Sequence, residues 1–236
     1  MPTEILARGV RSRKAVVALA ALVALVATFV VVLAGDDTDH GVPVLRGSGV
    51  AATRIRRVEP FNRVEMSAAG ILRVDVGKPG SLTLHGDDNL LGLIRTKVEG
   101  GTLVISQEGT VTASHGLEIA ASTPELVSIS LSGAGDVAVS GVEARSFTAD
   151  LAGAGRLDVD GRATQLKASL TGAGEVSLEH LLTRHATAVI IGAGAAHVYA
   201  IRSLDVTVSG MGRLDYRGDP ARVTTHLSGT GAVIPE

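Results

Sequence analysis

The residues of this 236-residue sequence that could do chemistry are repeated Gly-x-Gly tripeptides, scattered histidines and a few carboxylates. Each tripeptide has two glycines separated by one residue, which is alanine in the first four. The glycines lie at Gly133 and Gly135, Gly153 and Gly155, Gly172 and Gly174, Gly192 and Gly194, Gly210 and Gly212, and Gly229 and Gly231. A phosphate-binding loop needs a third glycine and a following helix, or the ending Gly-Lys-Ser/Thr. The tripeptides lack these features, so they do not predict a nucleotide site.

Carboxylates gathered on one face would indicate an enzyme that cleaves acidic polysaccharides, through a bound metal or acid–base chemistry. The position after each second glycine tests this, and it holds Asp136, Arg156, Glu175, Ala195, Arg213 and Ala232. Mixed charges and two alanines do not form a carboxylate ladder. The first three of these residues instead predict weak ion pairs between neighbouring repeats.

The histidines do not group as metal ligands usually do. They lie at positions 40, 85, 115, 180, 185, 197 and 226. His180 and His185 are five residues apart and lack a third ligand at a useful spacing, so they are expected to be surface residues. The run Asp87-Asp88-Asn89 could contact Ca²⁺, but a capped turn explains it more simply.

The sequence also lacks the residue patterns of other kinds of catalytic site. No nucleophile elbow places a serine beside a histidine, and the absence of cysteine excludes disulfides and thiolate metal sites. The sequence therefore predicts a protein that is not an enzyme, with no catalytic residue, cofactor or metal. The net charge of −2 gives no reason to expect nucleic acid as a partner.

The spacing of the tripeptides predicts the architecture. Their first glycines are separated by 20, 19, 20, 18 and 19 residues, which is typical of a repeat protein. Apolar residues alternate with polar ones on both sides of the glycines, as in half-buried strands. We therefore predict an all-β solenoid with glycines at its corners. At this period, residues 61–236 predict about nine coils.

The segment before the repeats also has the alternation of strands. Strands are predicted at Arg63–Met66, Leu72–Val76 and Ser81–His85, and a hairpin joins Thr96–Glu99 to Thr102–Ser106 through Gly100-Gly101. Residues 89–94 could form a brief helical turn.

The N-terminus has the pattern of a membrane anchor. A basic segment, residues 1–14, precedes twenty uncharged residues, 15–34, which are long enough to span a bilayer. The charge bias predicts a cytoplasmic N-terminus and an exported body, while a cleaved signal peptide is the alternative. Residues 35–57 are expected to be a linker, with a solvated basic cluster at Arg54, Arg56 and Arg57, and residues 58–236 the solenoid domain.

Several motifs together resemble one bacterial family. They are Gly86-Asp87-Asp88-Asn89-Leu90-Leu91, Thr102-Leu103-Val104-Ile105-Ser106, Pro124-Glu125-Leu126 and the serial phrases like Leu131-Ser132-Gly133-Ala134-Gly135-Asp136-Val137. Over roughly residues 58–236 the sequence resembles the DUF2807 family of auto-transporter adhesins with a head GIN domain. The resemblance implies a right-handed parallel β-helix, export, frequent N-terminal tethering and a role in adhesion, and it transfers no catalytic residues.

The leading hypothesis is a non-catalytic protein of the bacterial cell envelope, anchored by a single span, whose solenoid is used for adhesion or binding. Its expected partners are the membrane and an unknown envelope protein or glycan. If the apolar segment is cleaved, the protein would be secreted or periplasmic. A glycan-binding or glycan-acting protein is the alternative, with Tyr199 and Tyr216 as the tyrosines of the repeats. An envelope signalling component acting through a partner is a further alternative.

Overall fold

The computed structural model describes residues 44–236, and all their regular elements are β-strands. The strands are β1 (Leu45–Arg46), β2 (Ala51–Arg56), β3 (Arg63–Ser67), β4 (Ile71–Val76), β5 (Ser81–Asp87), β6 (Ile94–Glu99), β7 (Thr102–Gln107), β8 (Val111–Thr112), β9 (Glu118–Thr123), β10 (Ser128–Gly133), β11 (Asp136–Gly153), β12 (Arg156–Gly172), β13 (Glu175–Gly192), β14 (Ala195–Gly210), β15 (Arg213–Arg217), β16 (Arg222–Gly229) and β17 (Ala232–Pro235). The predicted segments 1–14 and 15–34 lie outside the described residues. Within residues 44–236, no helix is long and apolar enough to cross a membrane.

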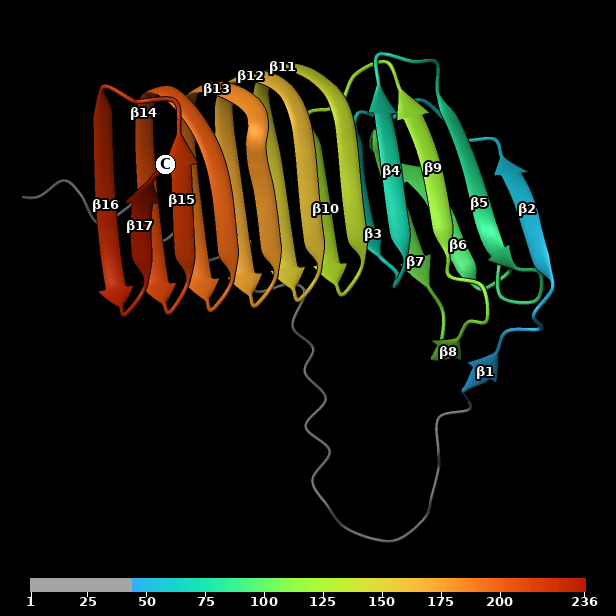
Figure 1. Ribbon diagram of the computed structural model, residues 1–236. Coiled ribbons are helices and arrows are strands. Elements are labelled where there is room, and N and C mark those ends of the chain that lie inside the picture. Colours follow the sequence, from blue (N-terminus) through green and yellow to red (C-terminus); the bar gives the residue numbers. More distant parts are fainter. Residues whose placement is uncertain (1–43) are drawn as a thin grey trace, which may run out of the picture. The chain divides into compact units, whose positions relative to one another are not determined.

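Strands β10 to β17 form a parallel β-solenoid (Figure 1). Each of the long strands β11 to β14 runs along one face, bends and continues along a second face. The first half of β11 pairs with β4 and its second half pairs with β10, so one strand contributes to two faces. The prediction of an all-β solenoid is confirmed.

The predicted number of coils is wrong. The solenoid has about five turns, not about nine. The region before β10 does not repeat at nineteen residues, because the antiparallel pairs β2–β5, β5–β9 and β6–β7 interrupt the parallel stacking there. The predicted hairpin is one of these pairs, β6–β7, and its turn glycines Gly100 and Gly101 have positive φ angles of 55° and 79°.

Two further segments differ from their predictions. Residues 89–93 form a hydrogen-bonded turn and no helix, and Ile94 begins β6. The amides of Leu90 and Leu91 both donate to the carbonyl of Asp87. Strand β2 falls in the segment predicted as a linker. Because β2 pairs along its whole length with β5, the described sheet begins before residue 58.

The two glycines of each tripeptide have different structural roles. The first glycines stack in register from Gly133 to Gly229, with positive φ angles between 113° and 133°. This region of backbone conformation favours glycine. The second glycines let adjacent turns approach closely. A Cβ on Gly174, for example, would lie 2.6 Å from the carbonyl oxygen of Gly155 and 2.6 Å from a methyl group of Leu151.

The inward side chains of both faces meet in one core of Leu, Val, Ile and Ala. Aromatic residues make up only 2% of the sequence, and Phe147 is a large side chain that is completely buried among the repeats. Each inward residue packs on the equivalent residue of the next turn. The outward residues are therefore also aligned in columns, and they define the surfaces available for function.

Candidate functional site

One outward face of the solenoid is dominated by hydroxyl groups, and we call it the hydroxyl face. It consists of the outward residues of β10, of the second halves of β11 to β14, and of β16. In register, its three columns are Ser128, Thr148, Lys167, Thr187, Asp205 and Thr224; Ser130, Asp150, Ser169, Val189, Thr207 and His226; and Ser132, Ala152, Thr171, Ile191, Ser209 and Ser228.

Most positions of the hydroxyl face are serine or threonine, and its charges do not pair. The ion pairs among the described residues do not include Lys167, Asp150 or Asp205. Asp150 lies in the central column, where burial raises the pKa of its carboxyl group. Strand alternation puts all these side chains outward at about 4.8 Å from turn to turn. The face is therefore a regular array of hydrogen-bonding groups with little net charge.

The second outward face, which we call the charged face, carries most of the ion pairs of the solenoid. It is formed by the outward residues of β4, of the first halves of β11 to β14, and of β15 and β17. Arg156 contacts Glu175 of the next turn, as predicted. Asp136 is aligned with Arg156, but the ion pairs of the described residues do not include Asp136. Arg217 bridges Glu179 at 2.6 Å and Glu236 at 2.7 Å.

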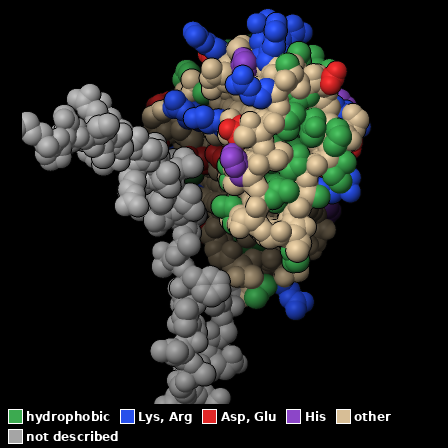
Figure 2. Space-filling view, turned by 90° about the vertical axis from the view of Figure 1, so that its left-hand side faces the viewer, with side chains coloured by type: hydrophobic (Ala, Val, Ile, Leu, Met, Phe, Trp, Pro, Cys, Tyr) green, Lys and Arg blue, Asp and Glu red, His purple; other side chains and the backbone are tan. Residues whose placement is uncertain are grey.

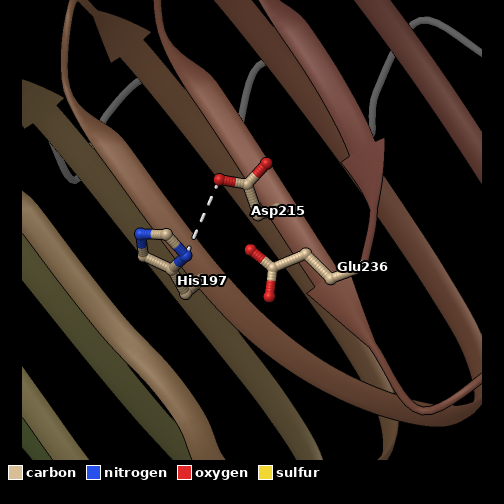
Figure 3. Close-up of side chains that lie close together, drawn as sticks. All are labelled: His197, Asp215 and Glu236. Carbon is tan, nitrogen blue, oxygen red and sulfur yellow. Dashed lines mark ion pairs between the residues drawn. The ribbon is translucent and has the colours of Figure 1, made fainter.

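The charged face contains the one group of described residues that could hold a metal ion by ligand type. His197, Asp215 and Glu236 come from β14, from β15 and from just beyond β17, and their ligand atoms all lie within 4.8 Å of one another (Figure 3). The Nδ1 atom of His197 is 3.7 Å from an oxygen of Asp215. A histidine with two carboxylates is a donor set that suits Zn²⁺.

The carboxylates of this group already have cationic partners. The Nε atom of Arg213 donates to both oxygens of Asp215 at 2.8 Å, and this contact raises the pKa of Arg213. Arg217 neutralises Glu236. Because Asp215 is only 3% exposed, it needs such a partner. We interpret the group as an ion-pair network that joins the last turns.

The sequence contained a signal for this group. Asp136, Arg156 and their equivalents directly follow the second glycine, whereas His197 and Asp215 both lie three residues after it. They are 18 residues apart, which is one step of the repeat, so aligning every outward column would have placed them together. The predicted surface residues His180 and His185 are indeed exposed.

One serine lies beside a histidine, but it belongs to strand β14 and not to a nucleophile elbow. The ring Nδ1 of His185 is 2.8 Å from the hydroxyl of Ser203 on the next turn. The hydrogen bonds of residues 44–236 give His185 no carboxylate partner, so this contact is not a catalytic triad.

A buried carboxylate outside the repeats joins three segments of the chain. Asp87 accepts hydrogen bonds from the backbone amides of Gly49, Ser114 and His115, and from the ring Nδ1 of His115 at 3.0 Å. The contact with His115 is the main cause that lowers the pKa of Asp87 to about 2. The predicted turn at Asp87 to Asn89 is therefore only partly right, because these side chains bind distant segments and do not cap their own turn.

An apolar cavity of about 290 Å³ lies beside Asp87 and His115. Its wall includes Leu90, Leu91 and Leu117. An Asp–His pair at a cavity resembles two members of a catalytic triad, but the described residues place no serine or threonine hydroxyl on His115. All the donors that reach Asp87 come from segments that it ties together, so the pair has a structural role.

Replacing Asp87 with Asn is expected to weaken the response of stability to acid. The folded-state pKa of about 2 lies below the ordinary value of 3.8. The stability that Asp87 contributes is therefore present above about pH 4 and is lost as the pH falls through about 2. The melting temperature of the wild-type protein should fall as the pH is lowered from about 4 to about 2. The melting temperature of Asp87→Asn should fall less over the same range. The exposed Asp205→Asn is the control and should keep the wild-type slope.

A family model matches residues 60–220, and its description is "Putative auto-transporter adhesin, head GIN domain". The chain belongs to this family, DUF2807. The match covers more than half of the chain, including the strands from β3 to β9 before the repeats and most of the solenoid. The resemblance seen in the sequence motifs is confirmed.

Solved structures share this fold. A "putative adhesin" from Bacteroides fragilis has 23% identity and a TM-score of 0.62, and the alignment covers 81% of this chain and 100% of that chain. Two proteins of Parabacteroides distasonis follow. One, a "putative lipid binding protein", has 21% identity, a TM-score of 0.54 and coverage of 82% and 100%. The other, a "putative adhesin", has 18% identity, a TM-score of 0.52 and the same coverage.

These identities are low enough that the structures support the fold alone. No curated protein matches the sequence. The description of the family as adhesins supports a role in adhesion or binding.

Proposed function

We propose that this protein is a non-catalytic, membrane-tethered adhesion protein of the cell envelope, and that the hydroxyl face of its solenoid is the contact surface. The observation that carries the proposal is the difference between the two outward faces. On the charged face, side chains are engaged with one another in ion pairs. On the hydroxyl face, the side chains form no such pairs with other residues of the described range 44–236, and this supports their availability to a partner.

The chemistry of the hydroxyl face suits an extended, uncharged partner. Each Ser or Thr hydroxyl can both donate and accept a hydrogen bond, and short side chains lose little conformational entropy when they are held. The parallel ladders fix the spacing of these groups before binding, and such preorganisation lowers the cost of association. A glycan or an extended polypeptide of the envelope offers the complementary row of polar groups.

The tether is proposed from the sequence pattern of residues 1–34. The basic segment 1–14 and the apolar segment 15–34 support a single span with the solenoid outside the cytoplasm. Adhesion requires this placement, because the contact surface must meet partners beyond the membrane. The neighbours described as adhesins are consistent with it.

The glycan-binding alternative would differ in its contact residues. Of the two tyrosines of the repeats, Tyr216 is half-buried and packs against the core, and Tyr199 is also half-buried. A sugar partner would therefore be bound mainly through hydroxyl groups.

Placing long charged side chains on the hydroxyl face is expected to reduce binding of the protein to cell envelopes. The variant carrying Thr171→Arg and Thr187→Arg replaces two exposed outward side chains with long charged ones, which should keep a partner away from the array. We expect the full-length variant to bind isolated cell envelopes roughly tenfold more weakly than wild type, equivalent to about 1.4 kcal/mol.

The matched control introduces two arginines on the charged face instead, as Ala138→Arg with Ala195→Arg. It should bind envelopes as wild type does. Equal binding by wild type and both double variants would show that the hydroxyl face is not the contact surface.

A further inference from the structure

The last described turn of the solenoid is built like the interior turns, but none of residues 44–236 packs on its outer side. Strand β16 pairs only with β14, and β17 pairs only with β15. All eight residues of β16 are exposed. Strand β17 is short and ends at Pro235, so β16 is the long edge that stays open.

The inward side chains of β16 show what this exposure means. Val223 and Leu227 are aligned with Leu204 and Val208 of the preceding turn. The side chains of the preceding turn are each 1% exposed, whereas Val223 is 38% exposed and Leu227 is 52% exposed. Figure 2 looks onto this end, where hydrophobic side chains gather. Among residues 44–236 the core column therefore reaches the surface without a cap, although terminal repeats of solenoids usually carry one.

The opposite end of the sheet is protected. Its edge strands are β2 and β6, which each have a single partner. Strand β2 carries Arg54 and Arg56, and β6 carries Arg95 and Lys97. Charged side chains on an edge discourage pairing with another chain. Strand β16 has one charge, Arg222, and no proline within it, so only this end lacks protection.

From this asymmetry we infer that the open end is covered by the same end of a second copy of this chain, with β16 pairing antiparallel to its counterpart about a two-fold axis at Thr225. This arrangement goes beyond the proposed adhesion function and does not depend on it. Closed two-fold dimers are the commonest assemblies of identical subunits. A head-to-tail contact would instead join β16 of one copy to the charged edge strands β2 and β6 of the next, where charged side chains discourage pairing.

The residues of β16 complement themselves about this axis. Val223 of one copy would lie opposite Leu227 of the second copy, and both side chains point toward the core side, so the two cores become continuous. Arg222 would lie opposite Ser228, so no like charges meet. A slip by one residue would place inward side chains opposite outward ones, and for this reason the pairing has a defined register.

Cross-linking through a single cysteine tests the inference in the full-length protein. The chain has no cysteine of its own, so Thr225→Cys provides the only thiol. At the two-fold axis the two Cα atoms of an antiparallel pair are separated by roughly 4.5–5.5 Å, which a disulfide can bridge. Mild oxidation should produce a covalent dimer.

Two controls decide the outcome. Ile55→Cys places the thiol on β2 at the other end and should give no dimer. Adding Leu227→Lys to Thr225→Cys puts a charge into an already exposed position, so the fold is kept while the dimer should be lost. No dimer at Thr225→Cys, an equal amount at Ile55→Cys, or a dimer that survives Leu227→Lys would each overturn the inference.

Discussion

Replacing Phe147 with alanine is expected to lower the free energy of unfolding by about 3–5 kcal/mol, the usual range for a fully buried phenylalanine. Phe147 is 0% exposed and is aligned with Leu166 of the next turn, which is followed by the small Ala186. Because its neighbours belong to rigid parallel ladders, they have little freedom to fill the cavity. Chemical denaturation of wild type and variant measures the change.

The control for this substitution is Ile191→Ala, which also shortens a large apolar side chain. Ile191 points outward and is 47% exposed, so its replacement should change the free energy of unfolding by no more than about 0.5 kcal/mol. Similar losses for the two variants would contradict the packing described for the core.

Replacing Gly192 with alanine is expected to cost roughly 3 kcal/mol, because backbone strain and overpacking each contribute about 1–3 kcal/mol. Gly192 has a φ of 120° and belongs to the interior of the glycine column. An added Cβ would lie 2.4 Å from the carbonyl oxygen of Gly172. This oxygen accepts the hydrogen bond of Ala193, so the clash would also disturb the ladder.

Gly92→Ala is the matched control for the glycine column. Gly92 lies in a surface turn without a positive φ, and an added Cβ would meet no atom within 4 Å. The control should be neutral or stabilise the protein by up to about 1 kcal/mol. If Gly192→Ala were as well tolerated as Gly92→Ala, backbone geometry would not be the reason that the tripeptides contain glycine.

The regular part of the fold could be predicted because each turn repeats the same pattern of glycines and alternating apolar residues. The period near nineteen residues aligns Gly133 with Gly153 and with every later first glycine, and the alternation of apolar residues then determines which side chains face inward. The prediction failed where the repeat stops. The Gly100-Gly101 turn predicted that β6 and β7 are antiparallel. Strand β5 also runs antiparallel to its neighbours β2 and β9, but no local pattern distinguishes it from a strand of a parallel coil.

The candidate sites differ in the same way. The columns of the hydroxyl face follow from the period and from strand alternation, so they could have been derived from the sequence. The contact of Asp87 with His115 could not, because it joins residues 28 positions apart in the irregular region. The network at Asp215 was partly predictable. His197 and Asp215 lie at equivalent positions of successive repeats, but this becomes visible only when every outward column is aligned.

The central claim is that a membrane-tethered protein presents this solenoid outside the cytoplasm. The most direct measurement combines fractionation of cells that contain the full-length chain with digestion by a protease that cannot cross the cytoplasmic membrane. We predict that the protein stays with the membranes after an alkaline wash and that the added protease removes the solenoid. Full-length protein found in the cytosol, or a solenoid degraded only after the cytoplasmic membrane is dissolved, would contradict the claim.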